Sequence, residues 1–209
     1  MLNYWMIPRP KRKLVAVVDV LAAFSFVTLA QQWQGQPETQ LSFEEELERL
    51  QLKAPGPRRD QGGSGARTYE SWLHSLGLIF KDSSHVQRLT LAGEALLAGE
   101  APVPIITNQL LRFQYPSSYS VRAGVNVNSR FRVHPFRFIL ELLRHPDIGT
   151  LSKAEMARFV ITLGETDASV PEVVREILRF RAYGDSVLPP DFPDRYPART
   201  GIQTLEETL

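Results

Sequence analysis

The sequence predicts a mainly α-helical protein that also contains small β-hairpins. Apolar residues recur every three or four positions in several stretches, which is the spacing of one face of a helix. Two short apolar-rich runs flank a polar turn near the middle of the chain, as the strands of a hairpin do. Clusters of proline and glycine separate these stretches. The predicted fold class is therefore mainly α, built from winged-helix and helix-turn-helix-like units.

Residues 68–118 hold the clearest helix and hairpin pattern. The first predicted helix ends at Gly77, a residue free to adopt positive φ. Runs 78–80 and 86–89 then form the hairpin, and Thr90 is expected to cap the helix that follows. Helix, hairpin and helix in this order indicate a winged-helix unit, a fold that binds DNA in some proteins and protein in others. The apolar face of the first helix consists of Tyr69, Trp72, Leu73 and Leu76.

The apolar run 14–30 follows a basic segment and imitates a signal peptide or a membrane anchor. Its 17 residues are at the short limit for a helix that spans a bilayer. Asp19 would lie deep in that bilayer, at a cost of about 2.5–3.5 kcal/mol. We therefore expect a buried or half-buried helix that begins after Pro8 and Pro10, with membrane insertion as the alternative.

Three further helices are predicted from their first residues. Ser42 with Glu45, and Ser152 with Glu155, have the spacing of a capping box, in which side chains satisfy free backbone donors of the first turn. Ser169 marks another helix start. The expected core faces are Phe43, Leu47 and Leu50 in the first helix, Met156, Phe159, Val160 and Leu163 in the second, and Val173, Val174, Ile177 and Leu178 in the third.

A helix is also predicted at 136–143, and a turn before Ser152 joins it to the next one. This spacing fits a helix-turn-helix unit and fits an ordinary helical bundle equally well. Residues 119–132 are expected to form a hairpin or an exposed loop, and the prolines after Gly184 are expected to interrupt any regular element. The apolar face of the 136–143 helix is expected to consist of Phe136, Ile139, Leu140 and Leu143.

The chain is expected to have five parts. Proline, glycine and arginine are concentrated in 53–67, which predicts a flexible basic connection without a core. The parts are an N-terminal helical subdomain at 1–52, this linker at 53–67, a winged-helix-like domain at 68–132, a helical, helix-turn-helix-like domain at 133–183 and a proline-rich C-terminal extension at 184–209.

Charge is distributed unevenly, although the formal net charge is only +1. The stretch from Ile105 to His145 contains six arginines and one acid, whereas the tail from Gly184 contains five acids and two arginines. A concentrated basic middle indicates an anionic partner, with a solvated basic surface as the alternative. The absence of cysteine excludes disulfides and zinc–thiolate sites.

The sequence shows no recognisable catalytic motif. A nuclease of the PD-(D/E)xK type needs an acidic residue two positions before a lysine, beside the carboxylates that bind the metal ion. None of the five lysines has one, and Glu38-Thr39-Gln40 imitates a glutamine variant of the pattern. Paired metal-binding histidines, a phosphate loop and a nucleophile elbow are also absent. We therefore expect a binding protein with no catalytic residue, no metal site and no cofactor in this chain.

Four blocks of sequence follow one another at a specific spacing. They are Arg67-Thr68-Tyr69 with Leu78-Ile79-Phe80, Leu89-Thr90-x-x-Gly93-x-x-Leu96, Leu110-Leu111-Arg112-Phe113-Gln114-Tyr115-Pro116-Ser117, and Pro135-Phe136-Arg137-Phe138-Ile139-Leu140-x-Leu142-Leu143 followed by Leu151-Ser152-Lys153. In order and spacing they resemble the recognition region of the AlwI-type type IIS restriction and nicking endonucleases, the group that includes the BspD6I nickase. The likeness extends over most of Trp5 to Arg181.

This resemblance implies a DNA-recognition module of mostly helical, winged-helix character that reads a short asymmetric duplex site. In that family a PD-(D/E)xK domain further along the chain, for which Mg²⁺ is expected, cuts a few base pairs away. Arg195-Tyr196-x-x-Arg199-Thr200-Gly201 resembles the motif that follows the recognition region, with Pro197 where an aromatic residue is usual. We expect a recognition fragment or stand-alone recognition subunit in the cytoplasm, with double-stranded DNA and a nuclease domain or subunit as partners and no membrane association.

Two other functions fit the same patterns. The first is a winged-helix protein-interaction or transcription-regulator module with no nuclease partner, whose basic middle would dock an acidic protein. The second is an active metal nuclease with a degenerate site.

Two groups of polar residues are expected to contact DNA. Basic side chains bind phosphates and supply salt-dependent affinity, whereas arginine can bond guanine, and asparagine or glutamine can bond adenine, at two atoms each. Arg130 and Arg132 are the strongest base-reading candidates because no acid lies in 101–140, and Phe113 and Tyr115 are expected in the core. The expected phosphate contacts are Arg12, Arg58, Arg59, Lys81 and Arg88, and Lys153 is a further expected DNA contact. Two or three residues are expected to read bases among seven candidates, which are Arg112, Gln114, Arg122, Asn126, Asn128, Arg130 and Arg132.

Overall fold

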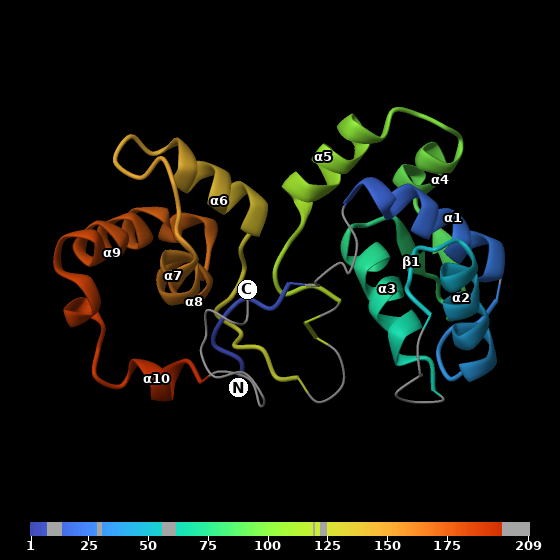
Figure 1. The fold of residues 1–209 in the computed structure, drawn as a ribbon, viewed down its shortest axis with the longest axis horizontal. Helices are drawn as coiled ribbons and strands as arrows, with labels where there is room; N and C mark the ends of the chain where they lie inside the picture. The colour runs from blue at the N-terminus through green and yellow to red at the C-terminus, as the bar shows by residue number, and fades with distance from the viewer. Residues whose placement is uncertain (8–13, 29–30, 56–61, 119, 122–124, 198–209) are drawn as a thin grey trace. The chain divides into compact units, whose positions relative to one another are not determined.

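The computed structural model describes residues 1–7, 14–28, 31–55, 62–118, 120–121 and 125–197. The described chain is mainly helical, as predicted, and contains a two-stranded antiparallel sheet (Figure 1). It divides into two compact units, each with its own core. The N-terminal unit is Pro8–Leu110, and the C-terminal unit combines Met1–Ile7 with Leu111–Leu209.

Helices make up most of the N-terminal unit, and one hairpin interrupts them (Figure 1). In the hairpin Ile79 pairs with Leu89 and Lys81 pairs with Gln87. The elements are η1 (Leu14–Ala16), α1 (Val17–Thr28), α2 (Pro37–Arg49), α3 (Ser64–Ser75), β1 (Ile79–Lys81), β2 (Gln87–Leu89), α4 (Leu91–Leu97) and α5 (Pro102–Arg112), whose last two residues belong to the C-terminal unit.

Three aromatic rings lie at the centre of the N-terminal core. Phe24, Trp33 and Phe43 meet edge to face, with ring centroids 5.1 to 6.0 Å apart, an arrangement that aromatic quadrupoles favour. Helix α1 is thus buried on one side and exposes Asp19 on the other, which confirms the buried helix expected in 14–30. None of the described helices is long and apolar enough to cross a membrane.

The predicted hairpin and the residues around it are confirmed. Gly77 follows α3 with a φ of +67°, and Thr90 caps α4 by accepting a hydrogen bond from Gly93 N at 3.2 Å. A side chain at Gly93 would collide with the carbonyl oxygen of Leu78. The Leu-Thr-x-x-Gly pattern therefore reflects a helix cap and a close backbone contact.

Two helix starts in this unit differ from the prediction. The capping box at Ser42 is wrong, because α2 begins at Pro37 and Ser42 lies inside the helix. Proline has φ fixed near the helical value and lacks a donor that the first turn cannot use, so it starts a helix without a side-chain cap. Helix α3 begins at Ser64, earlier than expected, within the segment 53–67 that was predicted as a linker.

The C-terminal unit is a cluster of helices with a few short extended segments between them (Figure 1). Elements α7, η2 and α8 follow one another without a break, and η2 is a π-helical turn. The elements are α6 (Pro135–Arg144), α7 (Lys153–Glu155), η2 (Met156–Val160), α8 (Ile161–Leu163), η3 (Asp167–Ser169), α9 (Val170–Tyr183), η4 (Gly184–Val187) and α10 (Phe192–Arg195).

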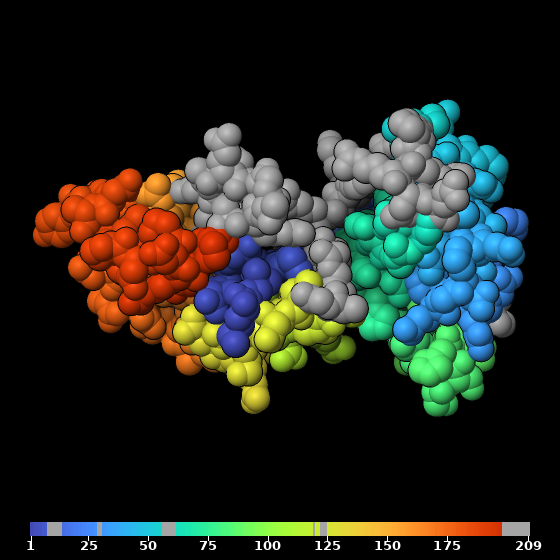
Figure 2. Space-filling model, turned by 90° about the horizontal axis from the view of Figure 1, so that it is seen from below, coloured from blue at the N-terminus to red at the C-terminus, as the bar shows by residue number. Residues whose placement is uncertain are grey.

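The first residues of the chain complete the core of the C-terminal unit. The Trp5 indole donates a hydrogen bond to Gly164 O at 2.7 Å, and the Tyr115 hydroxyl donates one to Tyr4 O at 2.8 Å. Burial raises the pKa of Tyr115, so this hydroxyl keeps its proton. Figure 2 shows the blue N-terminal segment against the yellow part of the same unit, where a backbone bridge joins them.

The buried side of α6 differs from the predicted one. Pro135, Phe138 and Leu142 face the core, whereas Leu140 and Leu143 are 49% and 37% exposed. Both sets of residues have helical spacing, because α6 carries apolar side chains on two sides. The helical period therefore located the helix but selected the wrong face.

The other helix starts of this unit are close to the predicted positions. Ser152 and Glu155 form the predicted capping box, and α9 begins one residue after Ser169. The expectation that prolines exclude regular structure after Gly184 is wrong, because η4 and α10 lie there. Pro193 stands in the first turn of α10, a position at which proline does not break a helix.

Packing groups the predicted parts differently from the five-part division. Helices from the predicted subdomain 1–52 share a core with the hairpin region of the predicted domain 68–132. The end of that domain, from Leu111 onward, packs instead with the helices of 133–183 and with Met1–Ile7. Each core thus combines stretches that are distant in sequence.

Candidate nucleic-acid interface

Three short extended segments lie side by side in the C-terminal unit. Tyr115 and Val133 exchange two backbone hydrogen bonds, of 2.8 and 3.2 Å, as an antiparallel pair. On the other side of the middle segment, Arg132 N donates to Glu165 O at 2.7 Å, and Arg132 forms a parallel bridge with Thr166. The middle segment is therefore fixed from both sides. We call this arrangement of 113–116, 131–134 and 165–167 the central ladder.

The central ladder has a buried side and an accessible side. Side chains alternate along extended backbone, and the core side consists of Phe113, Tyr115, Phe131 and Val133. This confirms the core positions predicted for Phe113 and Tyr115. Pairing of Tyr115 with Val133 places Gln114 directly across from His134 on the opposite side. We call the residues of that side, Gln114, Arg132 and His134, the polar face.

Asp167 holds the imidazole of His134 on the polar face. One carboxylate oxygen accepts the backbone N–H of His134 at 2.8 Å, and the other lies 2.7 Å from Nδ1 of the ring. Burial alone would raise the pKa of Asp167, but these bonds from His134 outweigh it and lower the pKa. Asp167 is therefore a carboxylate near neutral pH. The imidazole is fixed in one orientation and remains 30% exposed.

Arg130 has a partner that its sequence neighbourhood does not contain. Its guanidinium Nε lies 3.1 Å from Glu165 Oε1, and its Cζ lies over the ring of Phe131 at 5.9 Å. The prediction that no acid compensates the charge of Arg130 is therefore wrong, because Glu165 in the third segment of the central ladder does so. The pair is partly exposed, so it contributes no more than about 1 kcal/mol and leaves Arg130 able to exchange partners.

Arg132 and Gln114 are the freest of the predicted base-reading residues. Both are exposed, and neither side chain has a partner among the residues that the structure describes. The backbone of Arg132 is fixed on both edges, whereas its guanidinium extends from the ladder. Gln114 is anchored by the two buried aromatic residues that flank it. Rigid backbone with unoccupied polar ends is what base recognition requires.

The two predicted asparagines have different surroundings. Asn128 uses its side chain in local structure: Nδ2 donates to Asn3 Oδ1 at 3.1 Å, and Oδ1 accepts from Arg130 N at 3.2 Å. Asn126 is exposed, and its backbone oxygen accepts from Leu2 N at 2.7 Å. Asn128 is thus engaged in holding the loop to the N-terminal segment.

Arg112 and Lys153 lie at helix ends in the same unit. Arg112 is exposed at the last position of α5, and Lys153 is exposed at the first position of α7. The turn before Lys153 is fixed by Arg181, whose guanidinium donates to Glu155 at 2.6 Å and to the carbonyl of Thr150 at 2.6 Å. Sequence reasoning missed Arg181, because its partners lie about thirty residues away.

The two predicted phosphate contacts of the hairpin belong to the N-terminal unit. Lys81 is exposed and donates to Gln34 Oε1 at 3.3 Å, a distance that indicates a weak bond. Arg88 Nε donates to Asp82 Oδ2 at 3.0 Å across the hairpin. Arg12, Arg58, Arg59 and Arg122 lie outside the described residues.

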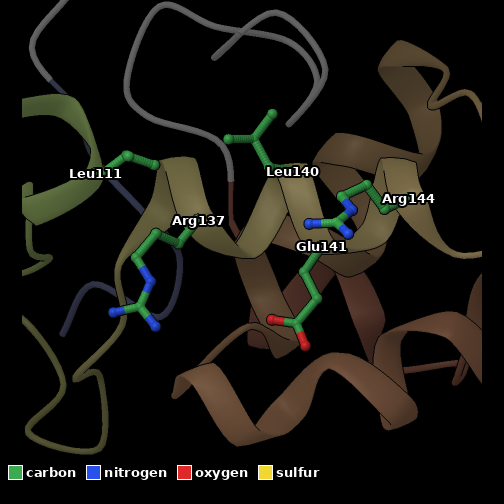
Figure 3. Close-up of a pocket in the computed structure, with 5 residues that line it drawn as sticks. All are labelled: Leu111, Arg137, Leu140, Glu141 and Arg144. Atoms are coloured by element: carbon green, nitrogen blue, oxygen red, sulfur yellow. The ribbon is translucent and has the colours of Figure 1, made fainter. Parts of the chain in front are cut away.

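A hollow of about 460 Å³ on α6 was not predicted. It is lined by Leu111, Arg137, Leu140, Glu141 and Arg144, and Figure 3 shows the last four projecting from α6. The guanidinium of Arg137 also helps to lower the pKa of Asp167, although less than His134 does. The sequence places these charges on a solvated helix face, and the exposed Leu140 adds apolar area to it.

The described residues form no group of three or more histidine, cysteine or acidic side chains able to hold a metal ion.

The model of the AlwI restriction endonuclease family matches residues 74–186, which is more than half of the chain. The matched region runs from α3 to η4 and includes the hairpin and the whole central ladder. No curated protein matches the chain.

Proposed function

Because the chain belongs to the AlwI restriction endonuclease family, we propose that it is a sequence-specific recognition module for double-stranded DNA. In this proposal the module belongs to a type IIS-like restriction or nicking endonuclease. The four sequence blocks make the chain similar to the group that includes the BspD6I nickase. Its location would be the cytoplasm. Cleavage belongs to a separate PD-(D/E)xK domain or subunit that uses Mg²⁺.

The polar face is the observation that supports this proposal best. Arg132 can bond O6 and N7 of guanine together, and Gln114 can bond N6 and N7 of adenine. Both project from the central ladder, whose other side is buried, so their backbone is already fixed before DNA binds and only their side chains lose conformational freedom. Base contacts of this kind select a sequence, whereas phosphate contacts position the protein.

Exposed basic residues at helix ends and in the hairpin would supply the phosphate contacts. Lys153 lies at the start of α7 with its side chain exposed to water. Lys81 and Arg88 belong to a hairpin that follows a helix, and we interpret it as the wing of a winged-helix fold. A wing usually follows the DNA backbone, so these contacts would add affinity without base preference.

Binding to duplexes of random sequence at two salt concentrations tests this function. We expect binding that weakens steeply as salt rises, together with enrichment of one short motif in the bound fraction. Incubation with Mg²⁺ should leave the bound duplex intact. Binding without enrichment would contradict sequence recognition, and cleavage would show that this chain carries its own nuclease.

The exposed leucines of α6 favour one alternative function. Leu140 and Leu143 are apolar side chains in contact with water, beside the guanidinium groups of Arg137 and Arg144. Such a surface suits an acidic protein partner, as in a winged-helix interaction or transcription-regulator module without a nuclease. The alternative predicts that charge-reversing changes on α6 abolish protein binding and leave DNA binding unchanged.

A further inference from the structure

We propose that His134, positioned by Asp167, is a further base-contacting residue that accepts a hydrogen bond from the amino group of adenine or cytosine. This inference rests on the proposed function and deepens it. The side chain lies on the polar face directly across from Gln114. It was not among the predicted contacts, because an isolated histidine in a basic stretch has no distinctive spacing.

The hydrogen bond to Asp167 determines which ring nitrogen carries the proton. The Asp167 carboxylate can only accept, and it lies 2.7 Å from His134 Nδ1. In the neutral form of the imidazole, the proton is therefore on Nδ1. Nε2 then presents a lone pair and acts as an acceptor.

Nε2 is also the ring atom left for a ligand. The imidazole is 30% exposed, and Nε2 has no partner among the described residues. The backbone of His134 is fixed as well, because its N–H donates to the same carboxylate at 2.8 Å. An acceptor with a fixed backbone and a fixed ring is thus presented next to Gln114 and Arg132.

Base edges in the major groove distinguish an acceptor from a donor. Adenine and cytosine present amino groups there, whereas guanine and thymine present only acceptor oxygen and nitrogen atoms. An Nε2 acceptor therefore favours adenine or cytosine. Protonation of Nε2 in place of Nδ1 would favour the acceptors of guanine or thymine and would disfavour cytosine most, because adenine also has an acceptor at N7.

The substitution Asp167→Asn moves the imidazole proton from Nδ1 to Nε2 with little change in the shape of the side chain. The asparagine oxygen can still accept the backbone N–H of His134, so the start of α6 keeps its bond. Its amide N–H₂ faces Nδ1 and donates to it, which moves the imidazole proton to Nε2. Asp147→Asn is the matched control, because it removes the same charge beside another histidine, His145, whose Nδ1 lies 3.8 Å from the carboxylate.

The test is to select bound duplexes from a random pool with the wild type, Asp167→Asn and Asp147→Asn, and to sequence them. We expect Asp167→Asn to keep the wild-type motif except at one position, where the preference shifts from adenine or cytosine toward guanine or thymine, most completely if the wild-type base is cytosine. The ratio of preferences there should change at least about fivefold, the effect of exchanging one hydrogen bond for an unpaired donor. Asp147→Asn should select the wild-type motif throughout.

Each other outcome has a definite meaning. An identical motif for Asp167→Asn, or one weakened evenly at every position, overturns the role of His134 and leaves sequence recognition standing. A wild type that selects no motif contradicts the proposed function itself. If thermal unfolding shows that Asp167→Asn does not fold, His134→Ala decides: loss of preference at one adenine or cytosine position supports the inference, and an unchanged motif overturns it.

Discussion

Two carboxyl groups, Glu155 in the C-terminal unit and Glu70 in the N-terminal unit, have different partners. In the C-terminal unit Glu155 is 4% exposed, and it bonds to Arg181 and to the capping residue Ser152. In the N-terminal unit the carboxylate of Glu70 accepts a hydrogen bond from the neutral side chain of Gln87. Gln87 is 3% exposed, and its Oε1 has no partner among the described residues. Glu155 thus has a cationic partner, whereas the hydrogen bonds of the half-buried Glu70 come from the neutral side chains of Ser71 and Gln87.

This difference appears in the acid–base properties of the two carboxyl groups. Burial alone would raise the pKa of Glu155, but hydrogen bonds from Arg181 and Ser152 outweigh it and lower the pKa. Burial also raises the pKa of Glu70, and there the bonds from Ser71 and Gln87 do not offset it. In the C-terminal unit, which carries the polar face, Glu155 therefore joins Ser152 to Arg181 of α9 through charge-assisted hydrogen bonds.

Breaking the Arg181 clamp should produce the largest effect on stability. Arg181→Met would leave the carboxylate of Glu155 buried without its cation, and we expect the free energy of unfolding to fall by about 3 kcal/mol. Urea unfolding measures this change. Arg179→Met is the control, because Arg179 is exposed and, among the residues that the structure describes, forms its ion pair with Glu176, so its loss should cost less than about 1 kcal/mol. Equal losses for both variants would show that the clamp contributes no more than a surface pair.

Removing Arg132 should have the largest effect on DNA binding. Arg132→Ala is expected to weaken binding of the selected duplex by about 1–3 kcal/mol and to relax the preference at one base pair. Arg130→Ala should fall at the low end of the same range, because Arg130 already shares its charge with Glu165. Titration of each variant against the selected motif measures both. If neither variant changes affinity or base preference, the central ladder is not the reading surface.

Much of the local structure could be predicted from the sequence. Gly77, Thr90 and the Ser152–Glu155 capping box act through neighbours a few residues away, so their patterns are complete within a short window. The start of α2 was predicted wrongly because Ser42 and Pro37 both fit a helix start, and the helix begins at the earlier of the two.

The candidate site was predicted incompletely because its contacts are distant in sequence. The exposure of Arg132 and Gln114 could be predicted, because both are polar residues that lie next to aromatic ones. The partners Glu165 and Asp167 lie more than thirty residues from Arg130 and His134, so no local pattern indicates them. The buried face of α6 was predicted wrongly, because Leu140 and Leu142 both fit a helical stripe. Only the packing of Leu142 in the core decides between the two faces.

Replacing Glu70 tests how far its hydrogen bonds offset the cost of burying its carboxyl group. The folded-state pKa of Glu70 is raised, so its protonated form favours folding, and that contribution is lost as pH rises through the folded-state pKa. Glu70→Gln carries no charge, and its amide can donate to the unpaired Oε1 of Gln87. We expect a gain of about 1 kcal/mol at neutral pH, which shrinks toward pH 4 as Glu70 of the wild type becomes protonated.

Urea unfolding at several pH values measures the gain from Glu70→Gln. Glu100→Gln, at an exposed position of the same unit, should have almost no effect at any pH. A gain that does not depend on pH would attribute the effect to the new hydrogen bond alone. A loss of stability at neutral pH would contradict the description of Glu70 as weakly compensated.

The smallest expected effect concerns the hairpin and separates phosphate binding from base reading. Lys81 is exposed and only weakly bonded, so Lys81→Ala should remove one phosphate contact and leave the fold intact. Binding should weaken equally for the selected motif and for random duplexes, and the slope of log K against log salt should decrease by about one. Arg49→Ala removes the same charge from the N-terminal unit, but Arg49 is paired with Glu46, and the slope should not change. A slope that Lys81→Ala leaves unaltered would remove the hairpin from the interface and leave recognition to the C-terminal unit.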